Sequence, residues 1–351
     1  MILRIGFWFV VLLAAVFVAH WGAERLTEPL KKLRRQWGIT AIAGGTLIGL
    51  ASASPEVGTN TISAIQGVSG IGLGNMLGAN IISVPLMVTV AYVATRKRNL
   101  SDDTSESGQS STGDSATTHQ NHEQHRHERL LQVDQSAVTV LALPYLGIIT
   151  LVAILTIPEP WRGLQPVDGA IMFLAYLLYA GQALVRGRQE GESVEWSAKE
   201  IGFAVAGLGA LAVGAYFTVR ATENLASLFG ISNVIAGLFI TATMSTTPEV
   251  FATWAVTRSG QVTSGATGVL TDNAVTMTLA FVPLALVTVT ITDFQLYWVN
   301  LVFVAVMPII YSAFLYWSRD ESGFSRWQVL VFILVYLGYV GVMLFGVLNI
   351  W

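Results

Sequence analysis

ASASPE at residues 51–56 and MSTTPE at residues 244–249 are the two stretches that decide how this chain folds. Each places a Pro-Glu pair deep inside a long apolar segment. Shifting the chain by 193 residues (249 minus 56) lays one on the other, and the match extends without a gap from 42–86 onto 235–279. Twelve of these 45 positions are identical, among them Asn80 with Asn273, which shared hydrophobicity alone does not supply. The chain is therefore predicted to contain two homologous halves.

The composition around these stretches is that of an integral membrane protein. Of 351 residues, 53% are hydrophobic and only 12% are charged, against about 25% charged in an average soluble domain. A helix needs about 20 apolar residues to cross about 30 Å of hydrocarbon. The hydropathy pattern predicts ten such spans, at 5–27, 37–66, 69–95, 134–157, 165–185, 197–220, 228–258, 261–290, 294–317 and 326–350.

Five spans in each half is an odd number, so the second half must enter the membrane the other way up. The predicted fold is all-α, with ten transmembrane helices arranged as two inverted five-helix repeats. The first repeat comprises 1–95 and 134–185, and the second comprises 197–351. In transporters, inverted repeats place the substrate near the bilayer midplane, on helices that Gly or Pro interrupts.

A hydrophilic loop at 96–133 separates parts of the first repeat. It is rich in Ser, Thr, Asp, Glu, His and Gln and nearly lacks apolar residues, so it is predicted to be disordered. Four of its histidines have spacings that could hold a transition metal weakly, although a solvated tract is the more ordinary interpretation. They are His119, His122, His125 and His127.

Lysine and arginine placement predicts the orientation, because basic residues that flank spans are retained in the cytoplasm. Ten spans with both termini outside leave 16 basic residues in inner loops and only Arg4, Arg162 and Arg220 outside. We therefore expect a multi-pass protein of the cell membrane with loop 96–133 cytoplasmic. The apolar run at 5–19 could also be read as a signal peptide, but it lacks a small-residue cleavage site.

Glu56 and Glu249 are the residues most expected to carry function. A carboxylate at that depth costs several kcal/mol unless it is paired or binds a metal ion. Pro55 and Pro248 each remove a backbone donor and free carbonyl oxygens, which are ligands for cations. Ser52 and Ser245 lie four residues before the glutamates, so each pair shares a helix face.

Two opposed carboxylates with hydroxyl and carbonyl oxygens suit calcium, which takes six to eight oxygen ligands. The same oxygens can hold sodium, whereas magnesium demands tighter octahedral geometry. The chain has no cysteine, which excludes thiolate sites, and no basic patch with aromatics that would bind nucleic acid. We predict no enzymatic activity and no cofactor; the expected partners are the lipid bilayer and small inorganic cations, and the pattern leaves the oligomeric state open.

The motifs resemble those of the cation/calcium exchanger superfamily, which includes the sodium/calcium exchangers. Its two alpha-repeats each carry a Gly-Thr-Ser-x-Pro-Glu-like motif and, on the next helix, a Gly-Asn-x-x-Gly-Ser-Asn-like motif. Here these are 51–56, Gly74 to Asn80, 244–249 and an eroded 267–273. The resemblance implies calcium or sodium ligands at the two glutamates and at Ser52, Ala53, Ser245, Thr246, Ala79, Ser83, Asp272 and Thr276.

Several of these positions depart from the superfamily pattern. Ala53 and Ala79 lack the usual hydroxyls, and Ser83 and Thr276 stand where Asn or Asp is usual. Asp272 stands where serine is usual and adds a carboxylate that the first repeat lacks. Asn80 and Asn273 form a symmetric pair that we expect to support the helices rather than to bind ions.

The leading interpretation is a secondary antiporter that exchanges calcium for sodium by alternating access. The nearest alternative is a proton-driven exchanger, because buried carboxylates can carry protons. A cation channel built from the same oxygens is a weaker alternative. An intramembrane aspartyl protease needs two aspartates, and Asp272 is the one aspartate deep in a predicted span.

Overall fold

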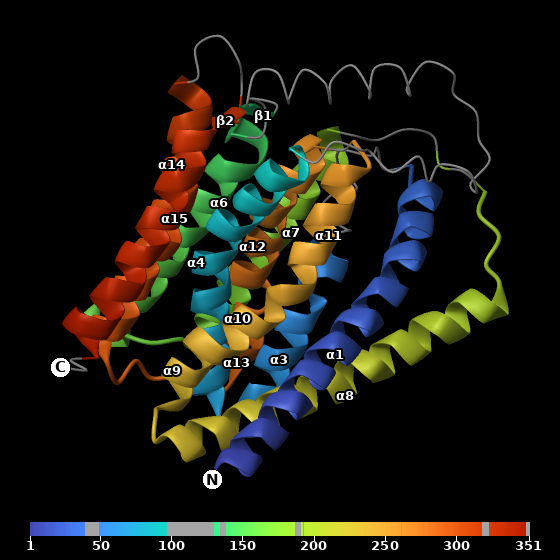
Figure 1. The fold of residues 1–351 in the computed structure, drawn as a ribbon. Helices are drawn as coiled ribbons and strands as arrows, with labels where there is room; N and C mark the ends of the chain where they lie inside the picture. The colour runs from blue at the N-terminus through green and yellow to red at the C-terminus, as the bar shows by residue number, and fades with distance from the viewer. Residues whose placement is uncertain are drawn as a thin grey trace. The chain divides into compact units, whose positions relative to one another are not determined.

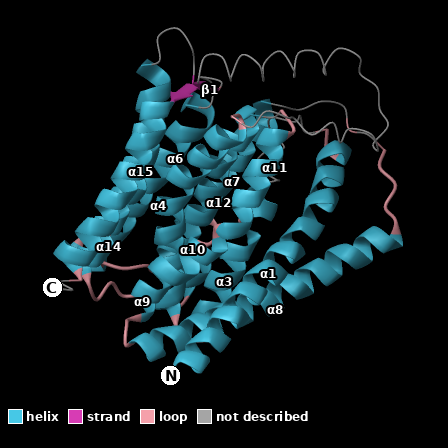
Figure 2. Cartoon of the chain, in the orientation of Figure 1, coloured by secondary structure: helices cyan, strands magenta, loops and turns pink. Residues whose placement is uncertain are grey.

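The computed structural model describes residues 1–38, 49–96, 130–133, 138–186, 191, 193–260, 262–317 and 323–348, which are almost entirely helical (Figure 2). The α-helices are α1 (Ile2–Gln36), α3 (Ser54–Ile65), α4 (Ser69–Ala94), α6 (Leu143–Thr156), α7 (Pro166–Arg186), α8 (Ala198–Phe229), α9 (Asn233–Ala236), α10 (Ala242–Ser245), α11 (Thr247–Arg258), α12 (Val262–Thr278), α13 (Phe281–Leu286), α14 (Phe294–Trp317) and α15 (Arg326–Gly341). Turns of π-helix occur at η1 (Val138–Ala142), η3 (Gly237–Thr241) and η4 (Val342–Val347), and a 3-10 turn at η2 (Glu159–Trp161). The strands are β1 (Leu130–Gln132) and β2 (Gly323–Ser325).

The helices confirm a multi-pass membrane protein. In the described part of the chain, seven helical stretches are long and apolar enough to cross a bilayer. They are Ile2–Leu33, Ser69–Ala94, Ala198–Phe229, Asn233–Arg258, Val262–Leu286, Phe294–Trp317 and Arg326–Val347. Leu143–Thr156 and Pro166–Gly181 are shorter apolar helices. Because 39–48 of the predicted second span lie outside the described residues, the count of ten stays a prediction.

The helix boundaries repeat with the same shift as the sequence. α3 and α11 correspond at both ends, since 247 minus 54 and 258 minus 65 are both 193. α4 and α12 begin at equivalent positions, since 262 minus 69 is also 193. Gly67 and Gly260 both have positive φ values, 72° and 87°, in the turns that follow α3 and α11. At these helices the repeat found in the sequence is therefore also present in the structure.

The chain packs into two compact units that cut across the two predicted repeats. Unit 1 comprises Met1–Asn80, Gly147–Thr246 and Thr271–Leu301, and unit 2 comprises Ile81–Leu146, Thr247–Leu270 and Val302–Trp351. Unit 1 thus joins segments from both halves of the sequence. The halves do not form separate domains, because the helices of one half bury their polar and small-residue faces on helices of the other.

In unit 1, α1 packs lengthwise against α8 (Figure 1). A Cβ atom on Gly22 would lie 2.7 Å from the Leu211 nitrogen, and one on Gly214 would lie 2.5 Å from the Ala19 nitrogen. The two backbones therefore touch directly, as small residues allow in membrane helix pairs. Elsewhere both helices are largely exposed: only 22% and 28% of their most apolar windows are buried.

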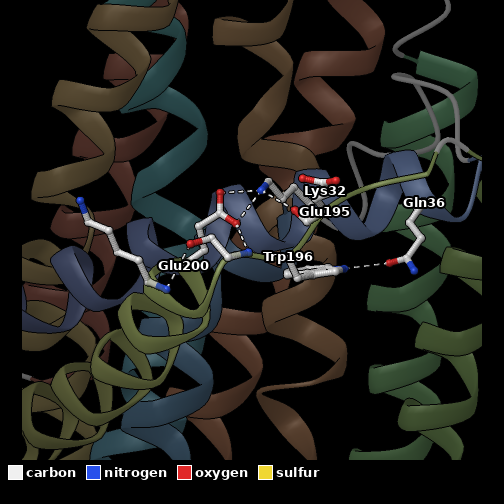
Figure 3. Close-up of polar contacts among 7 residues, drawn as sticks. Lys32, Gln36, Glu195, Trp196 and Glu200 are labelled. Carbon is white, nitrogen blue, oxygen red and sulfur yellow. Dashed lines mark hydrogen bonds and ion pairs between the residues drawn. The ribbon is translucent and has the colours of Figure 1, made fainter.

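A polar cluster fastens the end of α1 to the start of α8 (Figure 3). The Lys32 ammonium donates to both carboxylate oxygens of Glu200 at 2.5 Å and to the Glu195 carbonyl at 3.2 Å. The Trp196 indole donates to the Gln36 side chain at 3.2 Å. Glu200 also completes the capping box of α8 with Ser197, so one carboxylate both caps α8 and binds α1.

α4 also approaches its neighbours through glycines. A Cβ atom on Gly74 would lie 2.7 Å from the Leu238 nitrogen and closer still to the Val234 carbonyl. One on Gly78 would lie 2.7 Å from the Ala242 side chain, and one on Gly237 would meet the Ile71 carbonyl. The glycines of the Gly74 to Asn80 motif therefore bring α4 into backbone contact with the segment from α9 to α10.

This contact predicts a position-dependent effect of glycine substitution. Gly74→Ala should destabilise the protein by about 1–3 kcal/mol, because the methyl group enters space that backbone atoms occupy. Gly209→Ala in α8 is the matched control: nothing lies within 4 Å of its Cβ position, and alanine is the better helix former. Thermal unfolding in detergent should show a lower midpoint for Gly74→Ala alone. Equal midpoints would contradict the packing.

Aromatic rings join α14 and α15 in unit 2. Phe314 stacks edge to face on Trp327, with centroids 5.2 Å apart, and on Phe332, with centroids 5.8 Å apart. β1 pairs antiparallel with β2, with Leu131 opposite Phe324. The loop at 96–133 was predicted to be disordered, but its end forms a strand. The reason is that this strand pairs with β2 and buries Leu131 fully. Residues 97–129, including the four histidines, lie outside the described residues.

Two helices are longer than the hydropathy pattern predicted. α1 continues through Pro29 to Gln36 rather than ending at residue 27, and its additional turns pair with α8 through Lys32. α8 continues past residue 220 to Phe229 and ends at Gly230, which has a left-handed conformation. In both cases the helix extends into polar sequence that a hydropathy criterion does not count.

Candidate functional site

The site forms where the helix that carries Glu56 breaks. Residues 49–52 are helical, Ala53 forms a turn, and α3 starts at Ser54 with Pro55 in its first turn. Proline has no N–H for the Ala51 carbonyl, and the Ser54 hydroxyl donates to that carbonyl instead at 2.7 Å. The helix therefore breaks directly before Glu56, as the Pro-Glu pair predicted.

The second repeat breaks at the equivalent position. α10 ends at Ser245, Thr246 follows it, and α11 starts at Thr247 with Pro248 second. Upstream, the π-helical turn η3 adds a further irregularity at residues 237–241. π-helical turns inside α-helices occur frequently at functional sites.

Glu56 and Asp272 come together inside unit 1. Glu56 is 2% exposed and Asp272 is 6% exposed. The two carboxyl groups interact electrostatically. The Ser52 hydroxyl lies beside Asp272, and the Ser245 hydroxyl lies beside Glu56. Two acids and two hydroxyls from four helical segments thus form one polar cluster.

Each of the two acids keeps one oxygen without a partner. Glu56 Oε2 and Asp272 Oδ1 are buried and accept no hydrogen bond among the described residues. No ion pair to either acid forms among those residues. A buried carboxylate that is neither paired nor fully hydrogen-bonded is costly. Free oxygens on two interacting carboxyl groups are the kind of donor that hard cations prefer.

Neighbouring hydroxyl groups direct their oxygens in a way that suits a cation. The Thr246 hydroxyl donates to the Ala242 carbonyl at 2.5 Å, and the Ser245 hydroxyl lies 3.2 Å from the same carbonyl. A hydroxyl that gives its single proton to the backbone keeps its lone pairs for another group. Thr246 is fully buried, so its oxygen is unavailable to bulk water.

The other predicted residues of unit 1 lie on α4, on α12 and in the turn before α3. Ala53 and Ala79 are buried and contribute no side-chain oxygen. Thr276, one turn after Asp272 on α12, is 1% exposed, and its hydroxyl has no partner among the described residues. Asn80 donates to the Met76 carbonyl of its own helix at 2.7 Å. Asn273 is 2% exposed.

Unit 2 holds the remaining predicted residues. Glu249 lies in the first turn of α11 and is partly buried, and Pro248 is buried. Ser83 is 1% exposed on α4. Their participation in the ion site stays a prediction.

Two buried asparagines that were not predicted as site residues lie beside the site. The Asn75 carbonyl oxygen lies 3.3 Å from the Ser245 hydroxyl, and its amide nitrogen has no partner among the described residues. Asn60 donates to the Ala280 carbonyl at 2.8 Å, where the chain bends between α12 and α13. A signal existed for Asn60, which lies four residues after Glu56 and so on the same helix face.

Comparisons with known proteins give a match over most of the chain. The family described as "Sodium/calcium exchanger protein" matches residues 7–185 and 199–345. A curated relative, the sodium/calcium exchanger MaX1 of Methanosarcina acetivorans, is 31% identical over 83 residues, which is 23% of this chain and 23% of that relative's length.

Solved structures share the fold. The sodium-calcium exchanger NCX_Mj, soaked with 10 mM Na⁺ and zero Ca²⁺, matches with a TM-score of 0.58 and 17% identity over 97% of this chain and 99% of that one. The H⁺/Ca²⁺ exchanger CAX matches with a TM-score of 0.65 and 13% identity over 97% of this chain and 81% of that one. At these identities the likeness shows the fold alone.

Proposed function

Because the chain belongs to the sodium/calcium exchanger protein family, we propose that it is a secondary active antiporter that exchanges calcium for sodium across a membrane. The observation that carries this proposal is the buried pair Glu56 and Asp272, each with a free carboxylate oxygen. Two carboxylates balance the charge of one divalent cation. Ser52, Ser245 and Thr246 would supply further hard oxygens for calcium.

The same oxygens suit sodium, so the two cations would compete for one site rather than pass together. Glu249, Ser83 and Thr276 would complete the ligand set. Backbone carbonyls beside the breaks at Ala53 and Thr246 would add oxygens through their second lone pairs, and the buried Ala79 leaves room for the ion. Pro55, Pro248, Asn80 and Asn273 hold the broken helices.

Alternating access also needs the site to face each side of the membrane in turn. The proposed architecture has ten spans in two inverted five-helix repeats, 1–95 with 134–185 and 197–351, with both termini outside and loop 96–133 in the cytoplasm. The recurring boundaries of α3 and α11 support this arrangement. Inverted repeats allow one half to rock against the other around a fixed site.

A proton-driven calcium exchanger is the second candidate. Asp272 favours it, because the resemblance places serine at that position and a carboxyl can carry a proton. The likeness to the H⁺/Ca²⁺ exchanger CAX also keeps this candidate open. A channel is the less favoured candidate, because both acids are buried: Glu56 is 2% exposed and Asp272 is 6% exposed.

Calcium-45 uptake into proteoliposomes separates these candidates. We expect an outward sodium gradient at constant pH to drive accumulation well above equilibrium. Accumulation driven only by a proton gradient would show that protons, and not sodium, are the driving ion. Uptake that never exceeds equilibrium would indicate a channel, and no uptake in any arm would contradict calcium transport.

A further inference from the structure

Two cations from different helices converge on one aromatic ring at the α1/α8 contact. The Arg25 guanidinium carbon lies 5.6 Å from the centre of the Phe203 ring, and the Lys199 ammonium lies 5.8 Å from it. The guanidinium also lies 4.9 Å from the Trp21 ring. Ring faces attract cations, so Phe203 is a contact that Arg25 and Lys199 share.

Three carboxylates of this region have partners of their own. Glu200 binds Lys32 at 2.5 Å, Glu28 binds Lys31 at 2.7 Å, and Glu24 lies 3.5 Å from the His20 ring nitrogen. Among the described residues neither Arg25 nor Lys199 forms an ion pair. Adjacent helix positions such as Glu24 and Arg25 do not face each other. Within the described part of the chain, Arg25 and Lys199 therefore lack an anionic partner.

The position of this cation pair along the helices indicates which anion is available. The apolar run of α1 ends just before Glu24, and the apolar run of α8 begins at Ile201. Trp21 and Trp196 lie at the same ends, as aromatic residues do at membrane interfaces. Phosphate groups of lipids occupy that depth, and basic pockets between membrane helices bind them.

The surface beside the pair is suited to acyl chains. Phe17 and Val18 on α1 are 47% and 41% exposed, and Val205 and Leu208 on α8 are 62% and 53% exposed. A lipid whose phosphate lay between Arg25 and Lys199 could place its chains along these apolar faces. The site would thus match both parts of a phospholipid.

We propose that Arg25 and Lys199 bind the phosphate of an anionic phospholipid across the α1/α8 contact. The site is independent of the transported ion and of the residues around Glu56. A lipid bound there joins the two helices at the membrane surface, beside the link between Lys32 and Glu200.

Native mass spectrometry of the full chain in detergent tests this proposal, with phosphatidylglycerol and phosphatidylcholine as probes. We expect Arg25→Gln with Lys199→Gln to weaken phosphatidylglycerol binding at least tenfold and to leave phosphatidylcholine binding unchanged. Lys31→Gln is the matched control, because this lysine lies on the same end of α1 but already pairs with Glu28. Arg25→Lys, which keeps the charge, should retain binding and guards against misfolding of the double variant.

Three outcomes would overturn the proposal. The first is equal phosphatidylglycerol binding by the wild type and the double variant. The second is equal affinity of the wild type for the two lipids, which would remove the role of charge. The third is displacement of the lipid by millimolar inorganic phosphate, which would indicate a site for a free anion.

Discussion

Glu56→Gln is expected to reduce gradient-driven calcium uptake at least 100-fold. Glutamine keeps the size and one acceptor oxygen of the side chain but removes the charge. With Asp272 alone, a divalent ion would be buried with only one of its two charges balanced in unit 1. A 100-fold loss corresponds to about 2.7 kcal/mol of barrier or binding free energy. Calcium-45 flux in proteoliposomes at matched protein density measures this loss.

Glu159→Gln serves as the control for this variant. Its carboxylate is 85% exposed and lies 3.6 Å from Arg162 on the surface, so transport should be unchanged. The removal of an unpaired buried charge should also leave the thermal midpoint of Glu56→Gln equal or higher. Uptake by Glu56→Gln within twofold of the wild type would exclude Glu56 from the ion site.

Asp272→Ser is expected to raise the calcium concentration for half-maximal uptake at least tenfold, about 1.4 kcal/mol. The substitution restores the residue that the superfamily pattern has and leaves Glu56 as the one carboxylate of the pair. A single charge balances a monovalent ion better than a divalent one. Sodium should therefore compete with calcium more effectively in this variant. Uptake measured at several sodium concentrations separates the two effects.

Asp168→Asn is the matched control for Asp272→Ser. Asp168 is also 6% exposed, but its carboxylate accepts from the Gln165 backbone nitrogen at 2.8 Å at the start of α7. Its replacement should lower stability without changing calcium affinity. If Asp272→Ser transports with unchanged affinity, the aspartate contributes no ligand and the site resembles the superfamily pattern more closely than we propose.

The Pro-Glu pairs allowed much of the site to be predicted. Proline in a span breaks the hydrogen-bond ladder wherever it occurs, so the breaks beside Ala53 and Thr246 follow from local sequence. The shift of 193 residues between the repeats then placed Asp272 in register with Ala79. Local rules also predicted that buried oxygens would gather at the break.

Partners across helices could not be predicted in the same way. The contact of Ser245 with Asn75 depends on how α4 crosses the segment from α9 to α10, and that crossing depends on Gly74, Gly78 and Gly237. No periodicity of one segment encodes which face of another it meets. The extension of α1 to Gln36 depends likewise on a partner, because Lys32 binds Glu200 on α8, which is far from it along the sequence.

Equilibrium binding of calcium-45 to the purified protein tests the central claim most directly, because it requires no transport. The wild type should bind calcium saturably and release it on addition of sodium. The double variant Glu56→Gln with Asp272→Asn, shown to be folded by its thermal midpoint, should have no saturable, sodium-sensitive binding. Unchanged binding by that folded variant would contradict the claim that these two buried carboxylates hold the transported ion.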